Sequence, residues 1–223
     1  MHLIASGKFS DKKILIADKD DKRSNDRTWS FWETAPGLFE PIVFRRWKKT
    51  WFHGPGFSRL LELSPYEYKM IRGIDFYEHC LSVIGKHPNF EIRFGEIKSV
   101  TNEGNDAVLQ LNDEKLRAHY VFNSILFEKP ELQKKDYYLQ QHFKGWIIET
   151  PTPVFDPGEA TLMDFRTDQR HGTTFIYVKP FSAIKALVEY TLFNEQLLSP
   201  GEYEAGLREY ISQVIGIQAY TVI

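Results

Sequence analysis

The sequence has 223 residues, and its 28 Lys and Arg nearly balance its 30 Asp and Glu, so the net charge of -2 does not favour a nucleic-acid partner. Apolar residues make up 42% and charged residues 26%, which excludes a disordered tail, a collagen-like repeat and a coiled coil. Aromatic residues reach 15%, and so many rings need a large core, a ligand cavity or a membrane contact to cover them.

The chemistry-bearing residues exclude several further classes. The only cysteine, Cys80, permits neither an internal disulfide nor a cysteine zinc site. The 7 histidines lack metal-binding spacing, so we expect no metal. No apolar run approaches the roughly 18 residues of a membrane span, and the first residues do not resemble a signal peptide. We therefore expect a cytoplasmic protein, for which a peripheral membrane contact is still allowed.

The N-terminal segment indicates part of a nucleotide-binding βαβ unit. Residues 2–5 are typical of a helix end with Gly7 as its stop, and the apolar run 13–18 predicts a strand that ends in Asp18. An acid at the end of the second strand binds a ribose hydroxyl in such units. A solvated strand end is the competing interpretation. The glycine-rich turn of the first strand is not in this sequence, so we expect the natural protein to begin upstream of Met1.

Two short helices are predicted next, each from a capping box: Ser64 with Glu67, and Asp75 with Glu78. Before them, the segment 45–51 (RRWKKTW) combines basic and aromatic residues. It fits a membrane anchor, although a solvated loop is the commoner outcome and single-stranded nucleic acid a further alternative.

Short apolar runs then predict two sets of strands, followed by a helix at 199–214 that opens with another capping box. The predicted strands are 90–94, 97–101, 107–111 and 120–127, then 146–150, 160–166, 173–179 and 186–193. The last residues, TVI, read as a strand without a terminal turn, so both ends of the chain look cut.

The strand 186–193 carries the strongest candidate for acid chemistry. Alternation places Leu187, Glu189 and Phe193 on one face, where the apolar neighbours would desolvate the acid. Desolvation raises a carboxyl pKa, which suits a general acid. A rim carboxylate paired with Lys185 or Lys179 is the bland alternative, just as Asp164 reads most simply as an ion-pair partner of Arg166.

Four segments together resemble the lycopene β-cyclases of bacteria and plants: NDRTWSFW (25–32), LMDFRTDQ (162–169), FIYVKPFS (175–182) and ALVEYTLF (186–193). The resemblance extends from about Lys13 to the C-terminus. It implies an isomerase of carotenoid biosynthesis that closes the rings of β-carotene on lycopene or a related carotene without net oxidation.

The resemblance also implies the site residues. Glu189 matches the catalytic acid, Asp18 the ribose-binding acid of FAD, and Arg27 a residue near the flavin. Candidate substrate contacts are Trp29, Phe31, Trp32, Asp164, Tyr177 and Phe181, with core packing as the alternative for the rings. FAD in its reduced form is the expected cofactor, with NADPH as a candidate reductant, and the protein is expected to sit peripherally on the inner face of the membrane.

The implied fold is a mixed α/β flavoprotein fold with an antiparallel substrate-binding sheet. Residues 1–35 and 86–130 would form part of the FAD-binding domain, and residues 36–85 and 131–223 the substrate-binding domain. Tyr190 stands where plant enzymes have a second acid. Because glycine-rich flavin contacts are missing at both ends, we expect weak or absent flavin binding and no activity for this chain alone. A related flavin monooxygenase or halogenase, or a non-catalytic carotenoid- or lipid-binding protein, are the alternative functions.

Overall fold

The computed structural model describes residues 1–128 and 130–223, so residue 129 of the predicted 86–130 segment lies outside the described residues. The chain forms two compact units. Unit 1 contains Met1–Trp29, Leu38–Ile42 and Ile71–Glu131, and unit 2 contains Ser30–Gly37, Val43–Met70 and Leu132–Ile223. The division falls within two strands, β2 (Thr28–Glu33) and β6 (Glu67–Arg72). Residues 71–85, which the sequence assigned to the substrate-binding part, belong to unit 1.

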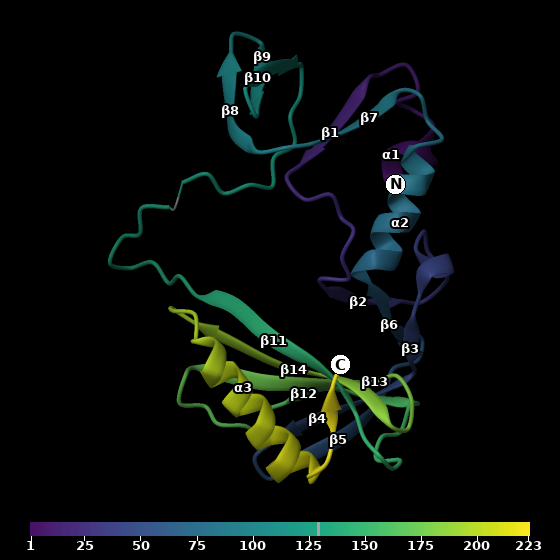
Figure 1. The fold of residues 1–223 in the computed structure, drawn as a ribbon, viewed down its shortest axis with the longest axis vertical. Helices are drawn as coiled ribbons and strands as arrows, with labels where there is room; N and C mark the ends of the chain where they lie inside the picture. Colours follow the sequence, from purple (N-terminus) through teal and green to yellow (C-terminus); the bar gives the residue numbers. More distant parts are fainter. Residues whose placement is uncertain (129) are drawn as a thin grey trace. The chain divides into compact units, whose positions relative to one another are not determined.

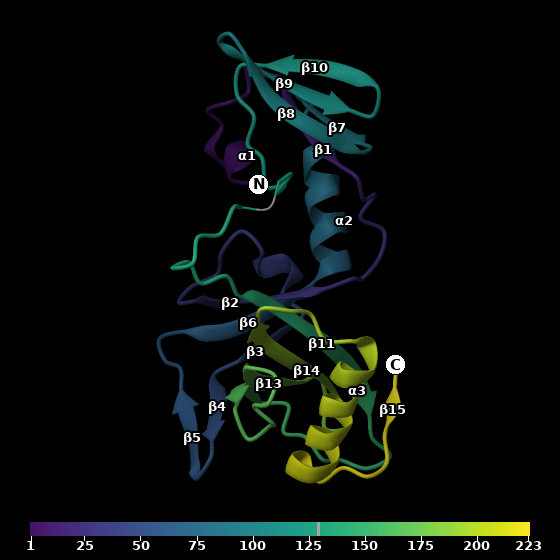
Figure 2. The same ribbon diagram turned by 90° about the vertical axis from the view of Figure 1, so that its left-hand side faces the viewer.

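Unit 1 contains a parallel strand pair and one long helix (Figure 2). The helix α1 (His2–Ser6) ends at Gly7 in the left-handed conformation, as predicted. The strand β1 (Ile14–Asp18) pairs in parallel with β7 (Phe90–Phe94), so that Asp18 lies opposite Phe94. The helix α2 (Gly73–Ile84) precedes β7 in the chain, as expected for a crossover between parallel strands.

A three-stranded antiparallel sheet follows β7 in the chain, in the order β10-β9-β8. Its strands are β8 (Ile97–Glu103), β9 (Asp106–Leu111) and β10 (Glu114–Ala118). The prediction of a strand at 120–127 is wrong: this segment is irregular, and Phe122 is 97% exposed. The two-residue turn Asn112–Asp113, with Asn112 at positive φ, closes a hairpin whose returning strand is the polar β10. Turn geometry, and not apolar content, therefore selects the third strand.

Of the two predicted short helices, the first is wrong and the second is confirmed with an earlier start. The first is the strand β6, which pairs antiparallel with β3 (Arg45–Trp47) and buries Tyr68 and Met70. Tertiary pairing overrides the local capping pattern there. The second is α2, which starts at Gly73, before the predicted cap. Asp75 lies in its first turn and accepts two hydrogen bonds from the Arg72 guanidinium.

Unit 2 is built on a seven-stranded sheet in the order β15-β11-β14-β13-β12-β4-β5 (Figure 1). The predicted second strand set corresponds to β11, β12, β13 and β14, whereas β4 and β5 were not predicted. All neighbours pair antiparallel except β12 and β4, which are parallel. The strands are β4 (Lys49–Gly54), β5 (Phe57–Glu62), β11 (Gln140–Glu149), β12 (Glu159–Asp164), β13 (Thr173–Pro180), β14 (Lys185–Asn194) and β15 (Thr221–Val222). The short 3-10 helix Glu40–Ile42 belongs to unit 1.

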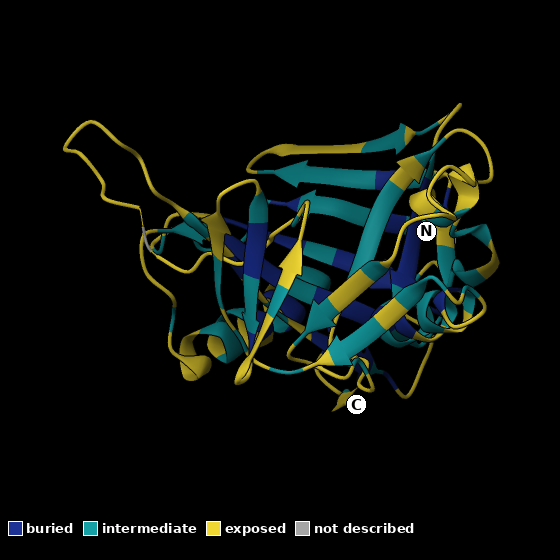
Figure 3. Cartoon of the chain, turned by 90° about the horizontal axis from the view of Figure 1, so that it is seen from above, coloured by how far each residue is buried: buried dark blue, intermediate teal, exposed yellow. Residues whose placement is uncertain are grey.

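One face of this sheet is covered by the helix α3 (Pro200–Glu209), which continues as a π-helical turn, Tyr210–Ile215 (Figure 1). The predicted capping box at its start is confirmed, because Ser199 and Glu202 make both reciprocal bonds. Val188 and Leu192 of β14 and Leu207 and Ile211 of the helix are all 0% exposed. Buried positions accordingly follow the central strands of the sheet (Figure 3).

The opposite face of the sheet packs a second core cluster around Trp47, Tyr68, Phe181 and Leu187. Trp47 is only 1% exposed. The neighbouring Trp51 donates its indole N–H to Glu159 at 2.7 Å. Trp47 is therefore part of the core and Trp51 is half-buried, while the membrane contact of segment 45–51 stays a prediction. In the described part of the chain, no helix is long and apolar enough to cross a membrane.

A buried ion pair ties the π-helical turn to β12. Asp164 is 0% exposed and accepts hydrogen bonds from the Arg166 guanidinium at 2.6 and 2.9 Å and from the Tyr210 hydroxyl at 2.7 Å. Burial opposes ionisation, but the bonds from Arg166 and Tyr210 outweigh it and lower the pKa of Asp164. The Asp164–Arg166 pair that the sequence suggested is thus present, with Tyr210 as a third member.

Replacement of Gly206 by Ala tests the packing of α3. An added Cβ would approach ring carbons of Tyr190 to 2.7 and 2.8 Å, so one of the two must shift. We expect G206A to cost about 1–3 kcal/mol of unfolding free energy, despite the helix propensity of alanine. The control G201A, where a Cβ meets nothing within 4 Å in the same helix, should be neutral or stabilise by up to about 1 kcal/mol. Denaturant unfolding followed by circular dichroism measures both, and equal stability of the two variants would refute the close contact.

Replacement of Asp164 by Asn tests the buried pair. Because the folded-state pKa of Asp164 is lowered, its contribution to stability is full above the unfolded pKa and is lost as the pH falls through the folded one. We expect D164N to cost about 1–3 kcal/mol near pH 7 and to weaken the acid dependence of stability below about pH 4. The control D168N removes the analogous but exposed pair with Arg170 and should change little. Thermal unfolding across pH checks this, and equal effects of the two variants would contradict it.

Candidate functional site

Glu189 lies at the centre of the large sheet, on the face away from α3. It stands opposite Tyr177 of β13 on one side and opposite Gly145 of β11 on the other. The predicted alternation is confirmed: Val188 and Tyr190 pack into the cluster under α3, whereas Leu187 packs into the cluster on the other face. The side chain of Glu189 is half-buried. Among the described residues, Glu189 forms no ion pair, which disfavours the bland interpretation of a paired rim carboxylate.

Gly145 places backbone without a side chain next to Glu189. A Cβ at that position would lie 3.7 Å from both Cβ and Cγ of Glu189 and 3.0 Å from Leu187. Any larger side chain at this position would therefore crowd the acid. The sequence analysis missed Gly145, although an isolated glycine within a strand pattern is a signal of a close approach.

Two tyrosines and a threonine surround Glu189. The hydroxyl of Thr191, which is buried, donates to Oε1 of Glu189 at 3.4 Å. Burial, and then the charge of Glu189, raise the pKa of Tyr177. Burial above all also raises the pKa of Tyr68, with Tyr177 and Glu189 as smaller contributors. Both phenols are therefore neutral at physiological pH, and they offer polar hydroxyls and aromatic rings without adding charge.

A buried lysine, Lys179, is also on this face. Lys179 is 5% exposed, and its Nζ lies 4.8 Å from the ring centroid of Tyr177. Burial lowers the pKa of this lysine, and the charge of Glu189 opposes the effect. The sequence analysis considered Lys179 only as an ordinary ion-pair partner. Its position two residues from Tyr177 in the same strand pattern was the signal that places it on the acid's face.

Aromatic rings continue from Tyr177 across the sheet in an unbroken series of contacts, here called the aromatic ladder. It consists of Tyr177, Phe175, Phe165, Phe52 and Phe57, with Phe193 as a branch from Phe175. Neighbouring ring centroids lie 5.3–6.3 Å apart. The ladder ends at Phe57, which is 51% exposed at the β4–β5 hairpin. Apart from Tyr177, none of its members was among the predicted substrate contacts, because they come from strands far apart in the sequence.

The other predicted aromatic contacts fall into different places. Trp32 lies against Tyr68 with ring centroids 4.6 Å apart, and Phe181 contacts Phe44 at 5.2 Å in the same unit as Glu189. Phe31 is half-buried on β2. Trp29 belongs to unit 1, where it packs against Phe76 and Tyr77. The structure thus brings Trp32 and Tyr177 to the surroundings of Glu189 through Tyr68.

Asp164 is on the other face of the sheet. It lies opposite Ile176, which packs under α3, and its carboxylate is fully engaged by Arg166 and Tyr210. Asp164 therefore does not join Glu189, and a contact with substrate stays a prediction.

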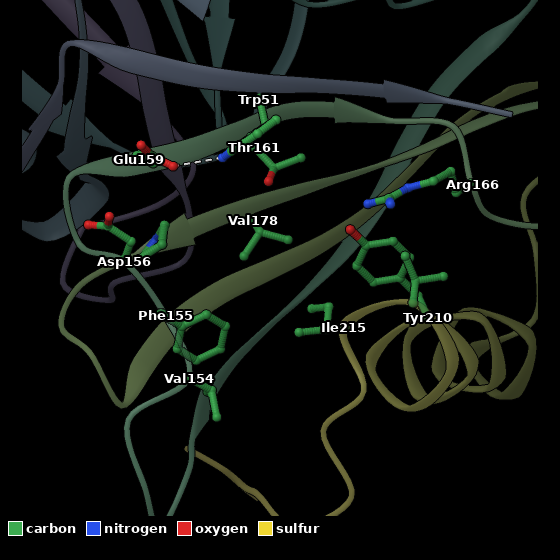
Figure 4. Close-up of a pocket in the computed structure, with 12 residues that line it drawn as sticks. Trp51, Val154, Phe155, Asp156, Glu159, Thr161, Arg166, Val178, Tyr210 and Ile215 are labelled. Carbon is green, nitrogen blue, oxygen red and sulfur yellow. Dashed lines mark hydrogen bonds between the residues drawn. The ribbon is translucent and has the colours of Figure 1, made fainter. Parts of the chain in front are cut away.

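A pocket of about 200 Å³ also opens on the α3 side of the sheet (Figure 4). Trp51 and Glu159 form one end, and Arg166 and Tyr210 form the other. Val178, whose side chain points away from the Glu189 face, lines the middle. The acid and the aromatic ladder lie on the opposite side of the sheet, so we place the candidate site at Glu189 and not in this pocket.

The predicted cofactor residues lie in unit 1. Asp18 stands at the carboxyl end of β1, where Oδ1 accepts the backbone N–H of Asp20 at 2.9 Å and Oδ2 lies 3.1 Å from Nζ of Lys22. Partial burial opposes ionisation, but these bonds prevail and lower the pKa of Asp18. Arg27 is exposed and paired with Asp26, which raises its pKa. Among the described residues, no group of acids, histidines and cysteines forms a metal site.

Solved structures show similarity in fold. A geranylgeranyl bacteriochlorophyll reductase-like protein from Thermoplasma acidophilum matches with a TM-score of 0.64 at 15% identity, covering 95% of this chain and 58% of that chain. PqsL, a probable FAD-dependent monooxygenase from Pseudomonas aeruginosa, matches with 0.55 at 14% identity, covering 95% and 66%. The halogenase PltM in complex with phloroglucinol and FAD matches with 0.53 at 12% identity, covering 80% and 43%.

These likenesses confirm the predicted mixed α/β fold of FAD- and NAD(P)-binding proteins, and at such identities they show the fold alone. The chain spans little more than half the length of the reductase-like protein. No significant match was found among curated proteins. The family described as lycopene cyclase protein matches residues 4–223, nearly the whole sequence. The chain therefore belongs to the lycopene cyclase family.

Proposed function

We propose that the protein of which this chain forms part cyclises lycopene, or a related linear carotene, to β-carotene by acid-initiated ring closure without net oxidation. The observation that carries the proposal is Glu189, an acid without an ion-pair partner among the described residues, set on a sheet face of aromatic rings. A general acid of this kind needs a largely apolar environment and a neighbouring surface on which an apolar chain can lie. The aromatic ladder and the neutral tyrosines support this requirement, and Gly145 adds no side chain next to the acid.

The reaction needs a single proton that is given and then recovered. Glu189 in its protonated form donates to the terminal double bond of the carotene, which leaves a tertiary carbocation. The neighbouring double bond attacks this cation and closes the ring. Loss of a proton from the ring to the Glu189 carboxylate then restores the acid, so atoms and charges balance.

The aromatic rings suit the charge that develops in this reaction. The faces of Tyr177, Tyr68 and Trp32 carry partial negative charge, which stabilises a cation without forming a bond to it. Because the phenols are neutral, no phenolate competes with the carotene for the proton of Glu189. The ladder offers an apolar surface for the part of a long polyene that extends beyond the reacting end.

FAD is proposed as the cofactor, and Asp18 is the residue whose surroundings fit it. A carboxylate has about four acceptor positions, so the bonds to Asp20 and Lys22 leave room for ribose hydroxyls. Arg27 would lie near the flavin in the proposed arrangement. When bound in its reduced form, with NADPH as a candidate reductant, the flavin would supply negative charge or an acid–base group and no net redox change.

Because carotenes dissolve in the hydrocarbon of a bilayer, we also propose that the enzyme works as a peripheral protein on the inner face of the membrane. The exposed aromatic end of the ladder at Phe57 supports contact with an apolar environment.

Replacement of Glu189 by Gln tests the proposed function. The longest reading frame that contains this chain is expressed in lycopene-accumulating cells, and the carotenes are separated by chromatography. Because Gln cannot donate the proton, we expect E189Q to lose at least about 100-fold in cyclisation rate, while carotene binding is retained. The matched control E149Q changes a partly exposed acid that pairs with Lys185 in the same sheet, and it should behave as wild type. Unchanged turnover in E189Q would remove Glu189 from the mechanism.

A further inference from the structure

Lys179 is a buried cation, and among the described residues it has no ion-pair partner, whereas the buried charges of Lys69 and Asp164 in unit 2 each have one. Lys69 is 2% exposed and lies 3.0 Å from Glu33, and Asp164 is bound by Arg166. Lys179 is 5% exposed, yet among the described residues it has no carboxylate at ion-pair distance. Its nearest charge-stabilising group is the ring face of Tyr177 at 4.8 Å. An unpaired ammonium is costly to bury, so a position of this kind calls for an explanation.

The sheet register places Lys179 beside Glu189. Tyr177 is directly opposite Glu189, and Lys179 is two residues further along β13, opposite Leu187. Residues in this diagonal relation on one face have Cβ atoms about 7 Å apart, a distance that a lysine side chain readily spans. On the other side of Glu189, Gly145 has no side chain that could push the carboxylate away from Lys179 or screen the two from each other.

We propose that Lys179 and Glu189 hold one proton in common, and that an apolar substrate, by covering both, moves this proton from the Lys179 ammonium to the Glu189 carboxylate. The proposal deepens the function proposed above and rests on Glu189 as its acid. One N–H bond breaks, one O–H bond forms, and the net charge of the pair stays zero. Lys179 acts through Glu189 and does not itself touch the reacting atoms.

The physical reason is the change of solvent that an oily substrate brings. In water the ordinary pKa values of lysine and glutamate, about 10.4 and 4.3, favour the ionised pair. Burial disfavours both charges and therefore favours the neutral pair, the more so when water is displaced. The burial of Lys179 already lowers its pKa in the substrate-free protein. Transfer of the proton also removes the positive charge of Lys179 from the vicinity of the developing carbocation.

Among the described residues, the other titratable groups on this face are two phenols and one ion pair. Tyr177 on β13 and Tyr68 on β6 have raised pKa values and stay neutral. Lys185 on β14 and Glu149 on β11 stand opposite each other and neutralise each other's charge. β11 presents Gly145 opposite the acid. The proton therefore resides either on the Lys179 amine or on the Glu189 carboxylate, and burial of the pair by the substrate shifts it to the carboxylate.

The first test measures the protonation of Lys179 directly and does not depend on activity. The protein is labelled with ¹³Cε-lysine, and the Lys179 resonance is identified by its loss in K179M. We expect Lys179 to titrate at lower pH than the exposed lysines, and E189Q to move its midpoint to still lower pH because the stabilising negative charge is lost. Addition of lycopene in mixed micelles at pH 7.5 should shift the resonance toward that of a neutral amine. An ordinary lysine titration, with no response to E189Q or to lycopene, would overturn the proposal.

The second test is the pH profile of cyclisation by the complete enzyme. In the wild type we expect a nearly flat profile between about pH 6 and 8.5, because the pair carries its own proton. In K179M no neighbouring group can return a proton to the acid, so the rate should fall as the pH rises across this range. The control K144M removes a lysine that pairs with Glu204 on the opposite side of the sheet, and it should keep the wild-type profile.

The two tests separate the proposals from each other. A wild-type pH profile in K179M would overturn the shared proton while leaving the cyclase function intact. A coupled titration of Lys179 and Glu189 in a protein that does not cyclise lycopene would overturn the function and leave the shared proton in place.

Discussion

The two-residue period of β14 is the constraint on which the rest of unit 2 depends. In ten residues this strand fills two different cores, because alternate side chains point to opposite faces of the sheet. Val188, Tyr190 and Leu192 are fixed under α3, so Leu187, Glu189 and Thr191 have no choice but the other face. A one-residue slip would bury the acid under the helix and expose the apolar set. The rigidity that holds the candidate acid is thus supplied by residues that never approach it.

Unit 2 holds its charges in two ways. On the α3 side of the large sheet, Asp164 is neutralised by Arg166 and fixed by Tyr210, and in the sheet β2-β6-β3 Lys69 is neutralised by Glu33. These are local, saturated pairs, and they set structure. On the candidate face, the charge of Glu189 acts on the buried Lys179, but the two form no ion pair. That difference is what makes the second pair responsive to whatever covers it.

Much of this fold can be predicted from the sequence because its signals are local. Apolar runs located β1, β7 to β9 and β11 to β14 but none of the strands β2 to β6. The alternation around Glu189 gave the correct faces, and the capping box at Ser199 marked the start of α3. The errors arose where distant pairing decided: Glu67–Arg72 becomes a strand because β3 lies beside it, and residues 120–127 have no partner strand in the described part of the chain. The site was predicted only in part, because some of its residues carry local sequence signals and others come together only through distant pairing. Glu189 and Tyr177 stand in recognisable patterns, whereas Phe52, Phe57 and Phe165 reach the ladder only through the three-dimensional sheet.

The parallel pairing of β4 with β12 affects how the molecule acquires its shape as well as its final form. Residues 49–53 meet residues 159–164 across more than a hundred residues of intervening chain. Joining segments so far apart carries a large loop-closure cost, and contacts of this kind slow folding. The β4–β5 hairpin and the antiparallel ribbon of β11, β13 and β14 can form from near neighbours first, whereas the ladder from Phe57 to Tyr177 exists only after the two have docked. The aromatic surface beside the acid therefore depends on the strand pairing of highest sequence separation in unit 2, and it is complete only when β4 has docked on β12.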